Sequence, residues 1–294
     1  MSMVISARYL PWLDRKGQFS ALKAVTLALM FAPGVWTAAQ LAAGWLQPKP
    51  ITLAIHATGD WAIRFLVVSL MITPLRRIAD WPKLILVRRM VGVTAFVYAL
   101  VHFTLYITDQ QWDLWVVGRE IALRFYLTIG FVALLGLATL AATSTDAMIR
   151  RLGAPRWGRL HKIVYTLAAI GLLHYMIQSK LDISRALFIL GLYIFFMLHR
   201  MLQKRNIATH FVSLMGLGVV AATLTALIEA LWYHLRNGVD MGRILLNNFN
   251  FLDGFQLSSD FEWTDLTSAW GVVGLGLGLA LINAVLKIKT ARPA

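Results

Sequence analysis

Histidine is the only residue type in this sequence that could support metal or redox chemistry at defined positions. The 294-residue chain contains no cysteine, which excludes disulfides, thiolate nucleophiles and iron–sulfur clusters bound by thiolates. A neutral imidazole can ligate the iron of a b-type heme, whereas a thioether ligand would have to come from scattered methionines. The seven histidines are His56, His102, His161, His174, His199, His210 and His234.

Two of these histidines, His102 and His174, lie deep inside apolar segments. Each is 12 residues from the start of its segment, and both segments are expected to cross a membrane in the same direction. The two imidazoles therefore lie at one level. An ionisable side chain inside lipid is costly unless it has a partner. The pair could ligate one heme from both faces, or each imidazole could hydrogen-bond a neighbouring helix as part of packing.

His161 is a third candidate, and helical geometry complicates its role. It precedes His174 by 13 residues, a rise of roughly 20 Å that suits two hemes stacked across a membrane. In an ideal helix, however, the two side chains are about 140° apart and cannot face one neighbour. The positions 13 and 14 residues before His102 are Arg89 and Arg88, so a matching fourth ligand is missing. His161 could ligate a heme alone or with a histidine of the sixth span, bind a quinone or flavin, or simply lie at an interface.

The elements that carry these histidines are predicted to be membrane-spanning helices. The chain is 59% hydrophobic and 14% charged, with a mean hydropathy of +0.66. A bilayer core about 30 Å thick needs roughly 20 apolar residues per helix. The apolar stretches are 24–45, 57–75, 90–108, 121–142, 162–178, 184–202, 209–235 and 265–286. We therefore expect an all-α polytopic membrane protein, a bundle of about eight transmembrane helices.

The net charge of +14 is explained by topology rather than by a nucleic-acid partner. Of 28 basic residues, 20 lie in the two terminal segments and in the alternate connections 76–89, 150–162 and 200–205, and six lie in the opposite connections. By the positive-inside rule, both termini are cytoplasmic. We expect the first apolar run to be a retained span and not a signal peptide. The glycines from Gly271 to Gly278 are expected to serve close helix packing.

Many spaced positions between residues 20 and 200 resemble one family. They are His56–Gly59, Arg64–Leu66, Ile72–Leu75, Arg88–Gly92, Leu100–His102, Tyr106, Tyr126–Thr128, Thr143–Thr145, Ala147–Met148, Arg156–Trp157, Leu160–His161, Val164–Tyr165, His174–Tyr175 and Lys180. The family is the ferric-reductase-like transmembrane group, and within it the heme-binding membrane subunits of the protein-methionine-sulfoxide reductase system.

This resemblance implies a core of six helices that carries one or two b-type hemes in a bacterial inner membrane. It implies electron transfer from the quinone pool or a flavin donor, with FMN as a second cofactor, to a periplasmic molybdopterin enzyme that reduces methionine sulfoxide in proteins. The chain would be the electron-transfer subunit and not the substrate-reducing catalytic subunit. By position, the implied iron ligands are His102, His174 and His161, and the expected contacts to propionates or a second cofactor are Arg64, Arg124, Arg88 and Arg89.

The resemblance does not cover the end of the chain. We expect a heme-binding domain over 1–205 and a two-helix extension over 206–294, with an acidic, aromatic outer loop at 236–264 that could dock a partner, cap the heme or lie in the membrane interface. Two other functions stay open. A self-contained, quinol-fed ferric or metal reductase would act without a partner protein, and a non-redox transporter or scaffold would carry no chromophore.

Overall fold

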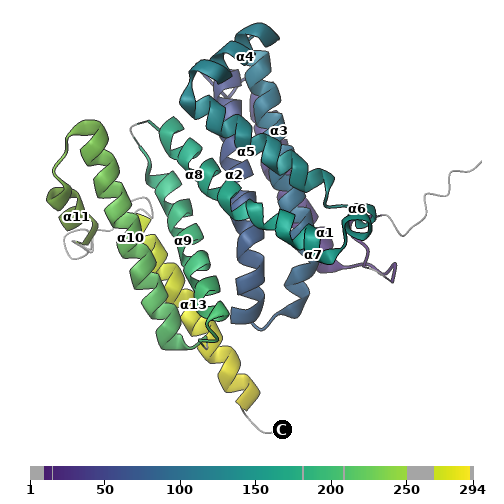
Figure 1. Cartoon of the computed structure of the whole chain (residues 1–294), viewed down its shortest axis with the longest axis vertical. Coiled ribbons are helices and arrows are strands. Elements are labelled where there is room, and N and C mark those ends of the chain that lie inside the picture. The colour runs from purple at the N-terminus through teal and green to yellow at the C-terminus, as the bar shows by residue number, and fades with distance from the viewer. Residues whose placement is uncertain (1–9, 15, 181, 208, 250–267, 292–294) are drawn as a thin grey trace, which may run out of the picture. The chain divides into compact units, whose positions relative to one another are not determined.

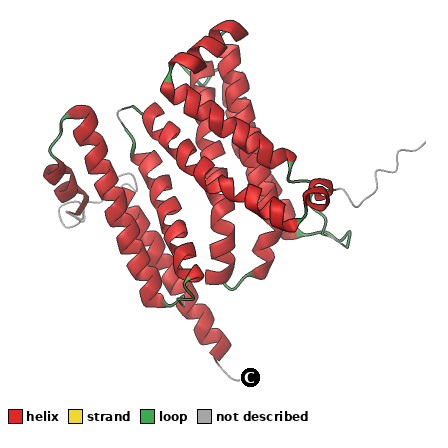
Figure 2. Ribbon diagram, viewed as in Figure 1, coloured by secondary structure: helices red, strands yellow, loops and turns green. Residues whose placement is uncertain are grey.

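The fold is helical throughout the part of the chain that is described. The computed structural model describes residues 10–14, 16–180, 182–207, 209–249 and 268–291. Figure 2 shows helices and connecting loops over these residues, and the only strand-like feature in them is an isolated bridge between Leu13 and Phe19. Eight helices in them are long and apolar enough to cross a membrane. The expected all-α membrane fold with eight spans is confirmed.

The chain forms two compact units, which are described separately. The first comprises residues 1–69 and 84–178. Within it α5 packs against α8, α3 and α4, and α1 packs against α3. Its helices in Figure 1 are α1 (Ala21–Ala42), the first part of α2 (Pro50–Ile78), α3 (Arg88–Asp109), α4 (Leu114–Leu123), α5 (Phe125–Ala142), α6 (Asp146–Leu152), α7 (Ala154–Leu160), the 3-10 turn η3 (His161–Ile163) and α8 (Val164–Gln178).

Two of the predicted spans in this unit are interrupted. The run 121–142 was expected to be one helix, but Arg124 has extended backbone angles (φ −108°, ψ 104°) and separates α4 from α5. The fifth span changes from α7 to α8 through η3, which begins at His161. The 140° separation between His161 and His174 was calculated for an ideal helix, so it does not apply to this broken one.

The second unit comprises residues 70–83 and 179–294, of which 181, 208, 250–267 and 292–294 are not described. The helices α9 and α13 pack against α10 and against each other, and α11 packs against α10. Figure 1 shows α10 and α13 side by side. The unit contains the end of α2, α9 (Ser184–Lys204), α10 (Phe211–Asn237), α11 (Met241–Phe249) and α13 (Ser268–Ala291), and the 3-10 helix η2 (Pro82–Val87) follows α2.

Close contact between α10 and α13 depends on glycine. A Cβ added at Gly276 would lie 2.8 Å from the Cα of Gly218, and one at Gly271 would lie 2.9 Å from the ring of Phe188. Added Cβ atoms at Gly274 and Gly278 would meet nothing within 4 Å. The predicted packing role is therefore confirmed for two of these four glycines.

The end of α2 is bonded to neighbouring helices through its backbone carbonyls. Pro74 has no N–H, so the Leu70 carbonyl four residues earlier lacks its helical donor. The Arg200 Nη2 donates to that carbonyl at 2.7 Å. One turn beyond Pro74, the Asn283 Nδ2 donates to the Ile78 carbonyl at 2.9 Å. Side chains of α9 and α13 thus satisfy carbonyls in the buried end of α2.

Packing groups α9 with the last two spans. The expected domain boundary at residue 205 was drawn from the family resemblance, and it stays a prediction. The boundary between the two compact units lies after Gln178. Of the predicted outer loop 236–264, residues 241–249 form α11, and residues 250–264 lie outside the described residues.

Candidate functional site

The first unit encloses a cavity of about 520 Å³ between α2, α3, α4, α5 and α8. This volume lies within the range of small-molecule and cofactor sites, about 300–1,000 Å³. The deep part of the cavity is lined by apolar side chains such as Leu66, Leu137 and Leu167. Polar residues line the opposite end, where α3 ends and α4 and α5 meet; they are Asp109, Gln110, Glu120, Arg124 and Gln178. The cavity is therefore apolar inside and polar at one end.

His102 from α3 and His174 from α8 both line this cavity and face each other. Their ring centroids are 6.5 Å apart, and the ring planes are at 85°. An imidazole nitrogen binds a transition metal at about 2 Å, and the ring centre lies about 1 Å further away, so two imidazoles sharing one metal have centres roughly 6 Å apart. The observed spacing fits a single metal atom between the two rings.

Each of these two rings is anchored through its Nδ1 atom. The His102 Nδ1 lies 2.8 Å from the carbonyl oxygen of Ile55 on α2, and the His174 Nδ1 lies 2.7 Å from that of Tyr126 on α5. Because a carbonyl can only accept, Nδ1 carries the hydrogen in both rings, and each Nε2 has a free lone pair. This is the arrangement by which proteins orient metal-binding histidines. His102 and His174 are therefore the residues that would hold a heme iron at this site, each through its Nε2.

Arg124 and Arg64 are two of the four arginines expected to contact a propionate or a second cofactor. Arg124 lines the cavity, and Arg64 is not among the described residues that do. The extended backbone at Arg124 places it where α4 joins α5. Its guanidinium pairs with Glu120 and donates to the Tyr126 hydroxyl at 3.1 Å. That hydrogen bond, with the nearby negative charge of Glu120, raises the pKa of Arg124. Arg64 pairs instead with Asp60 at 3.1 Å.

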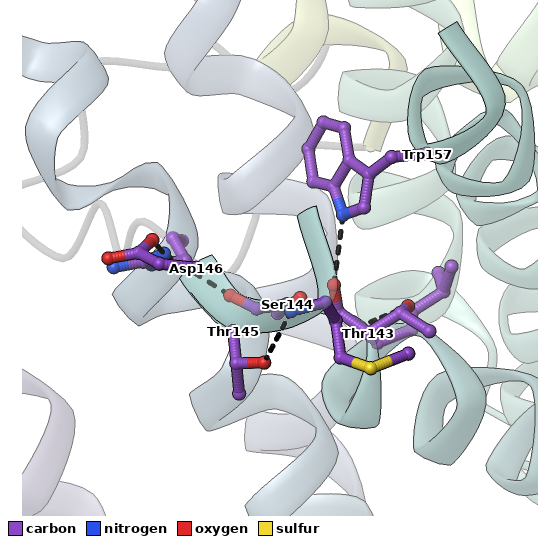
Figure 3. A network of polar contacts seen from close by, with 8 residues as sticks. Thr143, Ser144, Thr145, Asp146 and Trp157 are labelled. Carbon is purple, nitrogen blue, oxygen red and sulfur yellow. Dashed lines mark hydrogen bonds and ion pairs between the residues drawn. The ribbon is translucent and has the colours of Figure 1, made fainter. Parts of the chain in front are cut away.

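His161 lies outside the cavity lining and contacts Thr143 and Trp157, two residues of the polar network in Figure 3. Its Nε2 is 3.1 Å from the Thr143 Oγ1, and its ring stacks on Trp157 with centroids 4.0 Å apart. The Trp157 Nε1 in turn donates to the Thr143 carbonyl at 2.9 Å, a contact drawn in Figure 3. Both His161 and Trp157 are thus held against the end of α5. The structure does not bring His161 together with His102 and His174.

The arginines at the start of α3 lie at this network. Arg89 pairs with Asp146, and its Nη1 donates to the Ser144 carbonyl at 3.2 Å. Arg88 is half-buried and lies close enough to His161 for its charge to act on the ring. These two arginines therefore belong to the surroundings of His161, and neither is among the described residues that line the cavity.

The remaining histidines divide between the two units. His56 lines the cavity. His199 is 2% exposed and lies in the second unit, with its Nε2 3.3 Å from the Thr209 Oγ1. His234 Nδ1 is 3.0 Å from the Val239 carbonyl oxygen. His210 Nδ1 is 3.4 Å from the Lys287 Nζ. The sequence did not predict that the carbonyls of Ile55 and Tyr126 accept hydrogen bonds from the histidines, because every residue has a backbone carbonyl.

Comparison with known proteins gives a consistent result. Residues 58–172 match the family described as "Ferric reductase like transmembrane component". The chain is 41% identical over 180 residues to a protein of Rhodospirillum rubrum, a match that covers 61% of this chain and 84% of the relative. It is 45% identical over 131 residues to a protein of Herminiimonas arsenicoxydans, covering 44% of this chain and 60% of the relative. Both relatives are named "Protein-methionine-sulfoxide reductase heme-binding subunit MsrQ". No solved structure matches the chain.

Proposed function

This chain belongs to the family of protein-methionine-sulfoxide reductase heme-binding subunits, a ferric-reductase-like membrane family, and we propose that it transfers electrons through a heme b ligated by His102 and His174. The observation that carries the proposal is the facing pair of imidazoles, 6.5 Å apart. Both rings have Nδ1 bonded to a backbone carbonyl and Nε2 free. A pair of histidines that served only in packing would not need matching orientation on two separate helices.

The chain's own residues would bind and orient the cofactor. When bound, the heme iron takes up and releases one electron at a time. His102 and His174 would hold the iron through their Nε2 atoms, and the apolar end of the cavity would exclude water from the cofactor. Arg124 lies at the polar end, where its positive charge suits an anionic propionate. In this proposal Arg64, which is paired with Asp60, does not contact the heme.

We assign electron uptake to the other end of the first unit, around His161. Its Nε2 already interacts with Thr143, so a second heme there would require that contact to break. Stacked aromatic rings and the positive charges of Arg88 and Arg89 suit a quinone or the isoalloxazine and phosphate of FMN better. The proposed donor is therefore the quinone pool or a flavin, on the cytoplasmic side.

The proposed acceptor is a periplasmic molybdopterin subunit that reduces methionine sulfoxide in proteins. The relatives' printed name refers to a protein-methionine-sulfoxide reductase. The polar end of the cavity faces the side opposite the basic connections, which by the positive-inside rule is the periplasm. Both termini are then cytoplasmic in the inner membrane. The chain delivers electrons and does not itself bind the oxidised methionine.

The testing experiment is the visible absorption spectrum of the purified protein, oxidised and reduced with dithionite, with heme quantified as the pyridine complex. We expect a b-type spectrum in the wild type that is lost in His102→Ala and in His174→Ala. His234→Ala, outside the cavity, should keep it. We expect one heme per chain and an unchanged heme content in His161→Ala. A wild type that stays colourless after heme is supplied would refute the proposal and favour a transporter or scaffold.

One observation favours a second function. The carboxylates of Asp60, Asp109 and Glu120 all line the cavity, and carboxylate oxygens suit hard cations such as ferric iron. A quinol-fed ferric reductase would use them to receive its substrate directly. It predicts reduction of a ferric chelate by the purified, quinol-supplied protein without any partner, and loss of that activity in Asp109→Asn or Glu120→Gln with heme content unchanged.

A further inference from the structure

The two anchored histidines contact their neighbouring helices in the same way. The His102 ring donates to the carbonyl of Ile55, and Gly59 lies four residues later on α2. The His174 ring donates to the carbonyl of Tyr126, and Gly130 lies four residues later on α5. Residues four apart share one face of a helix. Each imidazole therefore lies against a helix face on which a carbonyl accepts its hydrogen bond and a glycine follows one turn later.

Each ring occupies the space that a side chain at the glycine would need. A Cβ added at Gly59 would lie 2.9 Å from the His102 Nδ1 and 3.0 Å from its Cε1. A Cβ added at Gly130 would lie 2.7 Å from the His174 Cε1 and 2.8 Å from its Nδ1. Ordinary contacts of a Cβ begin near 3.4 Å. Alanine at either position is therefore incompatible with the observed ring position.

The required displacement is large enough to break the anchoring hydrogen bond. To restore a 3.4 Å contact, the ring must move by about 0.5 Å at Gly59 and about 0.7 Å at Gly130, the differences between 3.4 Å and the two shortest distances. If the ring moves away from its carbonyl by this amount, the Nδ1–oxygen distances of 2.8 and 2.7 Å lengthen to roughly 3.3–3.4 Å, beyond the usual range for N–H···O bonds. The Nε2 atoms, which point to the iron position, move with the rings.

We propose that Gly59 and Gly130 are positioning residues for the heme. They act through His102 and His174, because the absence of a Cβ lets each imidazole bond to a backbone carbonyl and face the iron position. The hydrogen bond at Nδ1 makes the imidazole a stronger electron-pair donor to a metal. The two glycines thereby set how tightly the heme is held and how readily it is reduced. This inference rests on the heme assignment proposed above.

Other glycines of the same unit provide matched controls. A Cβ at Gly118 would meet nothing within 4 Å. A Cβ at Gly34 would lie 2.9 Å from the hydroxyl of Tyr98 on α3, the helix that carries His102. Neither Gly34 nor Tyr98 is among the described residues that line the cavity. Gly118→Ala should therefore be neutral, and Gly34→Ala crowds α3 without touching a histidine or the cavity lining.

The test compares Gly59→Ala, Gly130→Ala and the two controls by heme affinity, reduction potential and the low-spin ferric signal in electron paramagnetic resonance. We expect a 10- to 100-fold weaker heme affinity in the two glycine variants, as for loss of an outer-shell partner. Any heme that remains bound should have a higher reduction potential, because an imidazole that is a weaker electron-pair donor favours the ferrous state. Its electron paramagnetic resonance lines should also be shifted. Wild-type values in both variants, or equal shifts in Gly34→Ala, would overturn the inference.

A second measurement needs no heme. In the heme-free protein, Gly130→Ala should lower the unfolding midpoint in the wild-type background but not in His174→Ala, where the clashing ring is absent. An equal loss in both backgrounds would show that Gly130 does not act through His174. The heme assignment fails separately, if the wild type binds no heme or if the histidine variants retain it.

Discussion

Arg200→Met should destabilise the second unit, and most of that effect should disappear when Pro74 is replaced by alanine. The Leu70 carbonyl has no helical donor because Pro74 lacks an N–H, and the Arg200 Nη2 takes the donor's place at 2.7 Å. Leu70 is only 2% exposed, so water has little access to its carbonyl. Methionine keeps much of the apolar stem of arginine but has no donor.

The expected magnitude is worked from the loss of the hydrogen bond to the Leu70 carbonyl. A hydrogen bond with a charged partner contributes about 1.5–3 kcal/mol, and a buried carbonyl left without a donor costs about 1–3 kcal/mol. We therefore expect Arg200→Met to lower the free energy of unfolding by about 2–3 kcal/mol in the wild-type background. In Pro74→Ala the new N–H can bond the Leu70 carbonyl, and the same change should cost under about 1 kcal/mol. The resulting coupling, about 1–3 kcal/mol, lies within the range measured for interacting sites.

The assay is equilibrium unfolding of the four proteins of this cycle in detergent by titration with SDS. Helical circular dichroism and tryptophan fluorescence should report one transition. Arg205→Met, an exposed position just after α9, serves as the control for loss of one positive charge and should change the midpoint little. If Arg200→Met costs the same with and without Pro74, the carbonyl is not what Arg200 stabilises, and the reasoning is refuted.

Three further predictions concern single positions. Arg124→Ala should reduce heme retention, whereas Arg64→Ala should not, because only Arg124 lines the cavity; equal heme loss on gel filtration would contradict this. Gly276→Leu should lower the unfolding midpoint by overpacking against α10, and Gly278→Leu, which has open space, should not. The pKa of Asp182 is lowered because it accepts a hydrogen bond from the backbone amide two residues later. Because its pKa is lowered, the ionised carboxylate stabilises the folded state at pH values above the pKa of the unfolded chain. This stabilisation is lost as the pH falls through the pKa of the folded state. Asp182→Asn should therefore destabilise at neutral pH and not in acid, and unfolding midpoints from pH 2 to 7 would show whether that difference disappears.

Local sequence is enough to predict the membrane fold and the depth of the two principal histidines. Apolar length is a local property of the chain, so the predicted runs 90–108 and 184–202 correspond closely to α3 (Arg88–Asp109) and α9 (Ser184–Lys204). Counting residues from span ends was also enough to place His102 and His174 at one level. The depth of a residue in a helix follows from its rise of about 1.5 Å per residue and needs no tertiary information.

Which groups meet at that level depends on the packing of the helices. Whether His102 and His174 face each other depends on how α3 and α8 are rotated and packed, and helices of uniformly apolar sequence give little indication of this. The tautomer of each ring is set by the carbonyls of Ile55 and Tyr126, and a carbonyl is the same in every residue.

Dependence on contacts between helices also explains the other differences between the sequence predictions and the structure. The sequence placed His161 at the edge of an apolar run but did not show the 3-10 turn that begins there, because short breaks in a helix depend on contacts with other segments. It showed glycines but not which of them face a ring or another backbone. Local composition sets how far each residue lies along a helix, whereas side-chain contacts between helices set the chemistry that the cavity can perform.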